Sequence, residues 1–182
     1  MTTTVNSSFG AHMMAAGMVL NNVQDNFTHF DSISPGIPVN VMESGKKPRT
    51  SIAPTLVFDA QGRVELVIGS AGGSGIPDYI AQTLLNVYAY DMNLQKAMNR
   101  EHVSGQEITT INGERQLSSE LESGTRMARF LDQMIAMGHP AARVALLRSG
   151  LAAVQIKYDN EGKIRGLQGA ADRRRDGIAM SE

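Results

Sequence analysis

The sequence predicts a layered α+β protein in which antiparallel strand pairs are interleaved with two helices. Three observations carry this prediction: a hairpin pattern over 55–70, a second hairpin pattern over 151–170, and an apolar helical stripe that begins after Pro77. Strands joined by short turns pair in antiparallel fashion, whereas parallel strands need crossover helices. The pattern therefore argues against a doubly wound parallel sheet.

The first third of the chain combines short strands with one long loop. Strands are expected over 2–8 and 17–22, with a turn around Gly10. The stretch 23–49 is rich in Pro, Gly, Ser and Asn, and loops of this length are typical of binding loops or disordered segments. The turn residues D-A-Q-G over 59–62 then predict a hairpin.

A helix is predicted to begin at Pro77, because proline suits the first turn of a helix. Its buried face is expected to consist of apolar side chains at helical spacing, namely Ile80, Leu84, Val87 and Tyr88. A second helix is expected over 94–102.

The remaining elements follow in order. A hairpin is expected over 106–117 with its turn at Asn112-Gly113, and an amphipathic helix over 125–137, ended by Gly138. The last hairpin turns at 160–162, and the segment DRRRDG (172–177) after it is expected to form a solvated or salt-bridged turn.

Composition excludes several classes of function. The chain has 182 residues, enough for one domain with a sizeable core, and a formal net charge of −1, so no basic surplus indicates nucleic-acid binding. No apolar run is long enough for a membrane span. The absence of cysteine excludes disulfides and thiol nucleophiles, and the four histidines lack metal-ligand spacing, so neither a metal nor a cofactor is expected.

The glycine pair Gly72-Gly73 is the first candidate site. Consecutive glycines adopt positive φ and let backbone N–H groups converge on an anion, next to the positive end of a following helix. An oxyanion hole for acyl transfer is one interpretation. A phosphate cradle is a second, although the lysine of the GxxxxGK[ST] motif is absent. An ordinary strand-to-helix turn is the third.

Two hydroxyl-bearing segments are further candidates. Thr2 would become an N-terminal nucleophile if Met1 were removed, or it is an interior strand residue. Thr50 and Ser51 follow Lys46, Lys47 and Arg49, and hydroxyls beside cations suit a substrate carboxylate, whereas ordinary loop polarity is the alternative.

Taken together, five segments in order resemble the small subunit of the gamma-glutamyltranspeptidases, which are N-terminal-nucleophile hydrolases: TTTVNSSFG, GMVLNNVQDNF, PRTSIAPTLVF, GSAGGSGIP and GAADRRRDG. Positions that match the family pattern are frequent from Thr2 to Leu94 and sparse between Gly105 and Leu151. It implies a four-layer αββα sandwich, of which 1–182 would be the C-terminal part, a single small-subunit-like domain.

The resemblance also implies how such a domain works. A precursor cuts itself in two, and the new N-terminal threonine attacks a gamma-glutamyl amide. That threonine is expected upstream of Met1, so this chain is expected to be an inactive fragment whose partners are a large subunit from the same precursor and a small-molecule gamma-glutamyl substrate. Export to the periplasm or outside the cell is implied, a cytoplasmic location is left open, and the isolated fragment is expected to self-associate.

Residue by residue, the resemblance assigns a role to each matching position. Thr4 falls on the threonine that supports the nucleophile, and Asn6 on the asparagine that holds the substrate α-amino group. Thr50 and Ser51 fall on the pair that binds the α-carboxylate, and Gly72 and Gly73 on the oxyanion-hole glycines.

One departure from the family pattern concerns the α-amino group. Asn26 stands where the family has an acidic residue, and Val23 stands where it has a glutamine, while Asp25 is expected to point to the other face of a strand. Losing a charge-assisted bond weakens recognition of an ammonium group. A glutaryl-type acylase therefore stays open as an alternative, as does a non-catalytic paralogue. The stretch between Pro35 and Thr50 also lacks the family's lid tyrosine, which predicts a more open acyl site.

Overall fold

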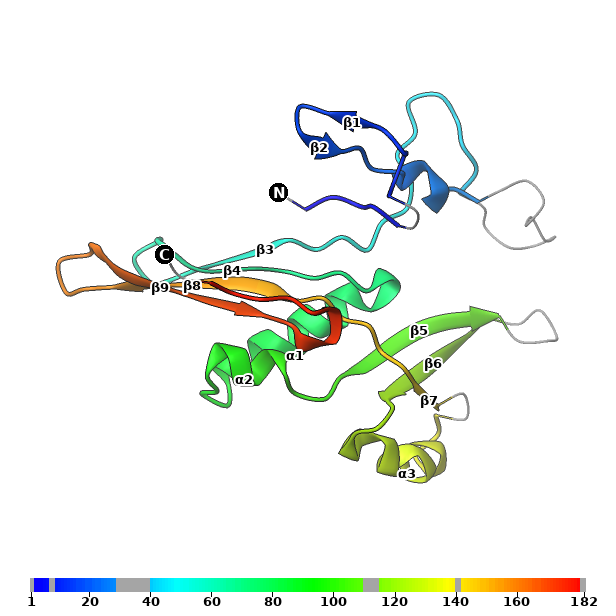
Figure 1. Cartoon of the computed structure of the whole chain (residues 1–182). Helices are drawn as coiled ribbons and strands as arrows, with labels where there is room; N and C mark the ends of the chain where they lie inside the picture. Colours follow the sequence, from blue (N-terminus) through cyan, green and yellow to red (C-terminus); the bar gives the residue numbers. More distant parts are fainter. Residues whose placement is uncertain (1, 7–8, 29–39, 110–114, 140–141, 181–182) are drawn as a thin grey trace. The chain divides into compact units, whose positions relative to one another are not determined.

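A computed structural model describes residues 2–6, 9–28, 40–109, 115–139 and 142–180 of the chain (Figure 1). Its contacts divide the chain into two compact units, Met1–Ile52 and Ala53–Glu182. The organisation as one small-subunit-like domain stays a prediction. Within the described residues, no helix is both long and apolar enough to cross a membrane.

The first unit contains a minimal hairpin and one turn of helix. Strands β1 (Met14–Ala15) and β2 (Met18–Val19) pair in antiparallel fashion, and a 3-10 helix follows over Val23–Asn26. The predicted strand over 2–8 is wrong for residues 2–6, and residues 7–8 lie outside the described part. A strand needs a ladder of hydrogen bonds. Among the described residues, this segment accepts one backbone bond, from the Asn22 amide to the Thr4 carbonyl at 3.3 Å.

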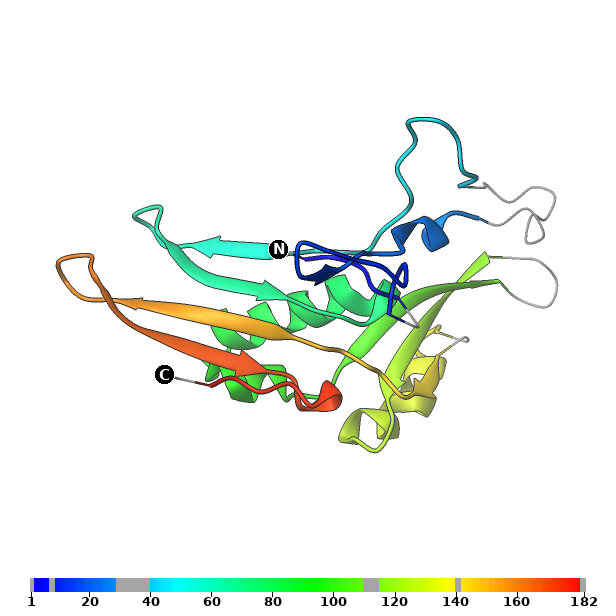
Figure 2. The same cartoon turned by 45° about the horizontal axis from the view of Figure 1, so that its top comes forward.

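The second unit is built on a four-stranded antiparallel sheet. Its strands are β3 (Thr55–Phe58), β4 (Val64–Gly69), β8 (Ala152–Tyr158) and β9 (Ile164–Ala171), in the order β3-β4-β8-β9. Figure 2 shows the two long hairpins side by side. Both hairpins predicted from their turn residues are confirmed.

Two helices, α1 (Ile76–Tyr88) and α2 (Leu94–Met98), cover one face of this sheet (Figure 1). The core lies between these layers and includes Leu66, Ile68, Tyr79, Ile80, Leu94, Met98 and Leu151. The predicted helical stripe is partly wrong: Ile80 is buried, but Tyr88 is 46% exposed. Leu84 and Val87 are partly buried against the core, and Ile76, Tyr79 and Thr83 complete the buried face of α1.

The predicted helix over 94–102 is too long, since α2 ends at Met98. The reason is tertiary. The His102 amide donates to the Glu122 carboxylate at 2.8 Å, and the next strand begins at Val103. A residue bonded in this way cannot also continue the helical ladder.

A second sheet consists of β5 (Val103–Thr109), β6 (Arg115–Glu122) and β7 (Arg143–Ala145), in that order. The antiparallel pairing of β5 with β6 confirms the third hairpin, whose predicted turn at Asn112-Gly113 lies outside the described residues. The pairing of β7 with β6 is parallel, so the prediction that all strands pair in antiparallel fashion is wrong for this pair.

The predicted helix over 125–137 divides into two shorter pieces. These are a 3-10 helix over Arg126–Phe130 and α3 (Leu131–Ala136). Neither piece fully buries a residue: Met127, Leu131 and Met134 are half-buried, while Phe130 and Ile135 are exposed.

Candidate active site

The predicted oxyanion-hole glycines lie in the turn between β4 and α1. Gly72 has φ +129° and Gly73 has φ +63°, and both values fall where glycine is strongly favoured. A short 3-10 helix over Gly73–Gly75 leads directly into α1, whose first turn contains Pro77. The backbone N–H groups of the turn therefore precede the positive end of a 13-residue helix.

The two glycines differ in their surroundings. A β-carbon at Gly72 would lie 2.6 Å from Tyr79 Cε2 and 3.2 Å from the Arg148 carbonyl oxygen. A β-carbon at Gly73 would have no heavy atom other than its chain neighbours within 4 Å in the described part of the chain. Gly72 is thus fixed by packing, while a methyl side chain at Gly73 would meet no other described residue.

The Tyr79 side chain packs against the turn at Gly72. Its side chain is 2% exposed, and its ring lies 4.8 Å from the His102 ring, centroid to centroid. Burial raises the pKa of the Tyr79 phenol, and the charge of Glu120 adds to the effect. The phenol is therefore a neutral group at physiological pH, and its role at the turn is steric.

We expect alanine to be tolerated far less well at Gly72 than at Gly73. At Gly72 the new β-carbon overlaps the Tyr79 ring, and overpacking adds about 1–3 kcal/mol to the cost of a positive φ. At Gly73 only the backbone cost of about 1–2 kcal/mol applies. Urea denaturation of Gly72→Ala and Gly73→Ala measures the difference. Equal destabilisation would show that Tyr79 does not constrain the turn.

The structure brings two other predicted site residues together in the first unit. The Asn6 side-chain amide donates to Asn26 Oδ1 at 3.4 Å. Asn22 braces the pair: its Oδ1 accepts from the Asn6 backbone amide at 2.9 Å, and its Nδ2 donates to Asp25 Oδ2 at 2.7 Å. The backbone N–H of Asn22 reaches the Thr4 carbonyl. Sequence reasoning missed Asn22, whose only signal was its neighbourhood to other polar residues.

Asp25 corrects one step of the sequence argument. Strand alternation was expected to aim it away from Asn26, but residues 23–26 form a 3-10 helix, so alternation does not apply. The Asp25 carboxylate is instead held by Asn22.

Thr50 and Ser51 lie at the end of the first unit. Thr50 is exposed, and its hydroxyl oxygen accepts from the Ile52 amide at 3.1 Å; Ser51 is half-buried. Lys46, one of the nearby cations, forms an ion pair with Glu43 at 3.3 Å. The predicted site residues are thus divided between the units, with Gly72 and Gly73 in the second and the others in the first.

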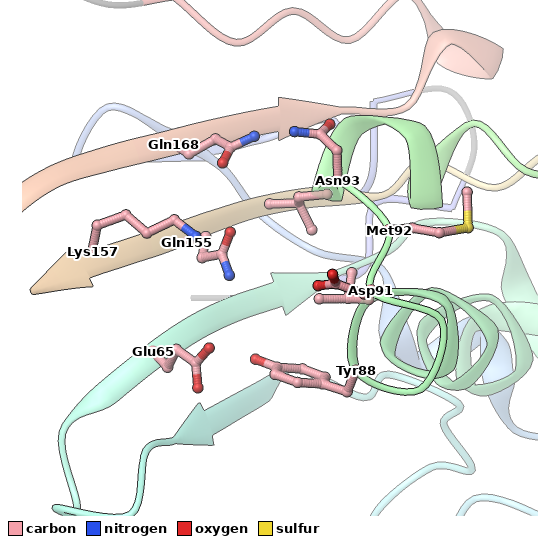
Figure 3. Close-up of a pocket in the computed structure, with 10 residues that line it drawn as sticks. Glu65, Tyr88, Asp91, Met92, Asn93, Gln155, Lys157 and Gln168 are labelled. Atoms are coloured by element: carbon pink, nitrogen blue, oxygen red, sulfur yellow. The ribbon is translucent and has the colours of Figure 1, made fainter.

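A polar pocket of about 360 Å³ also lies in the second unit (Figure 3). It is lined by residues from three strands and both helices, with the loop between the helices: Glu65, Val87, Tyr88, Asp91, Met92, Asn93, Leu94, Gln155, Lys157 and Gln168. Burial and the neighbouring Glu65 carboxylate raise the pKa of Tyr88. None of the predicted site residues lines this pocket. No three metal-ligating side chains cluster anywhere in the described ranges.

Comparisons with known proteins match the chain to a family model and to named relatives. The family model described as gamma-glutamyltranspeptidase matches residues 1–182. "Glutathione hydrolase 3" of Arabidopsis thaliana is 34% identical over 129 residues, covering 63% of this chain and 20% of its own length. A "glutathione hydrolase proenzyme" of Bacillus subtilis is 28% identical over 181 residues, covering 98% of this chain and 28% of its own length. The match thus spans 20% and 28% of the length of these two relatives.

A solved structure extends the match to the fold. The T380A mutant of Helicobacter pylori gamma-glutamyltranspeptidase superimposes with a TM-score of 0.69 at 28% identity, covering 96% of this chain and 91% of that one. The predicted α+β architecture, of the kind found in N-terminal-nucleophile hydrolases, is confirmed.

Proposed function

Since the chain belongs to the gamma-glutamyltranspeptidase family, we propose that it is the small-subunit part of an acyl-transferring amidohydrolase. The full protein would hydrolyse or transfer the gamma-glutamyl group of glutathione and related amides. The nucleophile would be the N-terminal threonine that the family resemblance places outside residues 1–182. The observation that supports this most directly is the Gly72-Gly73 turn before α1, with positive φ at both glycines.

The proposed reaction has two steps. The threonine hydroxyl oxygen attacks the amide carbonyl, the C–N bond breaks, and the hydroxyl proton leaves with the amine, which yields an ester. Water or an amine acceptor then attacks the ester and regenerates the hydroxyl. Both steps pass through an oxyanion that the N–H groups of Gly72 and Gly73 would stabilise by about 3–4 kcal/mol per donor. Thr4 would support the nucleophile from the first unit.

Asn6 and Asn26 are proposed to bind the α-amino group of the substrate. Thr50 and Ser51 are proposed to bind its α-carboxylate. The Asn6–Asn26 hydrogen bond supports the assignment because it places two amide side chains next to each other. A carboxamide oxygen accepts a bond from an ammonium group, but more weakly than a carboxylate does. The names of the relatives favour gamma-glutamyl substrates over the glutaryl-type alternative.

The partner is proposed to be a large subunit from the same precursor. Four apolar residues on the sheet face opposite α1 and α2 are 41–66% exposed: Leu56, Val67, Val154 and Leu167. Three of them stand in one row, since Leu56 pairs with Val67 and Val67 with Val154. An apolar row of this kind is typical of an interface. Self-association of the isolated chain is proposed because this apolar row would then be uncovered. Export of the full protein is proposed from the family resemblance.

The full-length protein tests the substrate assignment when assayed on a gamma-glutamyl anilide and a glutaryl anilide. We expect faster cleavage of the gamma-glutamyl anilide. We also expect Asn26→Asp to raise its kcat/KM about tenfold, because a carboxylate binds the α-ammonium group about 1.4 kcal/mol more strongly. Asn99→Asp, which adds the same charge at the end of α2 in the second unit, is the matched control.

The two results separate the alternatives. Faster glutaryl cleavage would overturn the gamma-glutamyl assignment and leave an acylase. An Asn26→Asp protein that behaves like Asn99→Asp would show that Asn26 does not face the α-amino group. No cleavage of either anilide by correctly processed protein would indicate a non-catalytic paralogue.

A further inference from the structure

We propose that Ser149 is a positioning residue that fixes the Gly72-Gly73 turn, acting through Gly150 on one side and the buried carboxylate of Asp172 on the other. The inference rests on the oxyanion role of the turn under "Proposed function". It adds a residue to that site from a part of the chain where the family resemblance is thin.

The first link joins the turn to the segment before β8. Ala71, which immediately precedes Gly72, exchanges two backbone hydrogen bonds with Gly150, each of 3.1 Å. The Gly150 amide also lies 3.3 Å from Ser70 Oγ. These bonds extend the β4–β8 pairing past Gly69 and carry it to the residue next to the turn.

The close approach of the two segments requires the glycine at 150. A β-carbon there would lie 2.9 Å from Ala71 Cβ and 2.8 Å from Arg175 Cδ. The Arg148 carbonyl likewise lies 3.2 Å from the site of a β-carbon on Gly72. Any shift of 148–150 is therefore transmitted to the turn, because closely packed groups move together.

The second link anchors 148–150 from the opposite side. Ser149 is fully buried, and its hydroxyl donates to Asp172 Oδ2. The backbone amide of Asp172 donates to the Leu151 carbonyl at 2.8 Å, and Arg175 Nε donates to the Arg148 carbonyl at 3.0 Å. The Leu151 amide also lies 3.4 Å from Asp172 Oδ2, so the Ser149 side chain is one of several contacts that join 148–151 to 172–175.

The anchor itself is held firmly. Asp172 is 1% exposed, and its Oδ1 accepts from both the backbone and the guanidinium of Arg174, at 2.9 and 3.2 Å. Arg174 is in turn paired with Glu122. A carboxylate fixed in this way holds the Ser149 hydroxyl in one place. Oxyanion stabilisation depends on such placement, since a misplacement of about 1 Å can cost about 10²-fold in rate.

Ser149→Ala in the full-length protein tests the inference with two readouts. Hydrogen exchange followed by mass spectrometry reports on the amides of Ala71 and Gly150, and we expect both to exchange about tenfold faster. Kinetics on the gamma-glutamyl anilide should show kcat reduced about tenfold with KM within about twofold, because the turn is proposed to act on the transition state. Thr83→Val removes another buried hydroxyl, bonded to the Tyr79 carbonyl inside α1, and is the matched control.

Ser149→Cys, of similar volume but with a weaker donor, guards against misfolding of the alanine variant. It should give exchange rates between those of wild type and Ser149→Ala. Wild-type exchange at Ala71 and Gly150 in either Ser149 variant would overturn the anchoring role. Faster exchange with unchanged kcat would support the anchoring and contradict the oxyanion role of the turn, so the two failures are distinguishable.

Discussion

Replacing Arg174 with methionine is expected to lower the free energy of unfolding by about 3–5 kcal/mol, because two buried carboxylates lose their counter-charge. The guanidinium donates to Glu122 at 2.6 and 2.9 Å and to Asp172 at 3.2 Å. It also reaches the carbonyls of Met98 and Arg100, at 3.2 and 2.7 Å. Burial opposes the charged form, but hydrogen bonds and charges from Glu122 and Asp172 outweigh it and raise the pKa of Arg174.

Arg173→Met is the matched control for this substitution. Arg173 precedes Arg174 in the same turn but is exposed, so its replacement should change the free energy of unfolding by less than about 0.5 kcal/mol. Urea denaturation near neutral pH measures both variants. Equal effects of the two substitutions would mean that the buried network does not hold β6, α2 and the end of β9 together.

Lowering the pH from 7 to 4 is expected to remove about 3 kcal/mol of stability through His102 alone. Its side chain is 1% exposed, and neither ring nitrogen has a hydrogen-bond partner within the described residues. Burial lowers the pKa of His102 to about 4, and the charge of Arg174 adds to this, against the opposing charges of Glu122 and Asp172.

The sign follows from proton binding. In the unfolded chain, histidine takes up a proton near pH 6.5, whereas the folded protein resists protonation until about pH 4. Acid therefore favours the unfolded state across this window, and the contribution of His102 is fully present above pH 6.5. Carboxylates with lowered pKa values, such as Glu101, change the stability of the protein only below their usual pKa near 4.5. Their effect therefore falls largely outside the window between pH 6.5 and 4.

His102→Phe separates this effect from general acid denaturation. Phenylalanine keeps a ring against Tyr79 but cannot take up a proton, so the loss of stability between pH 6.5 and 4 should largely disappear. Thermal unfolding at several pH values measures the slope for both proteins. The same slope in both would place the acid sensitivity elsewhere.

The hairpins show what local sequence can specify. The turn residues at 59–62 and 160–162, flanked by strand-forming runs, predicted β3–β4 and β8–β9, because a tight turn fixes the register of both strands. The glycine turn is also specified by local sequence. Positive φ at Gly72 and Gly73 is a backbone property that the residue type makes accessible by itself.

Elements whose ends depend on distant partners were predicted less well. The predicted helix over 94–102 ends at Met98 because Glu122 binds the His102 amide, a contact that no local pattern encodes. The strand β7 has only three residues and pairs in parallel with β6, so it lacks a turn signal. Asp25 was misplaced because a single helical turn over 23–26 cannot be distinguished from a short strand by periodicity.

The sequence by itself determined the family, the three hairpins and the glycine turn, because these depend on residue types at short spacing. Only the tertiary structure decided that Asn6 meets Asn26, that Ser149 meets Asp172, and that the ion pairs of DRRRDG are buried. Arg174 and Glu122, for example, are 52 residues apart in the sequence. Contacts of this kind form only when packing excludes water and pays the desolvation of both charges through their mutual hydrogen bonds.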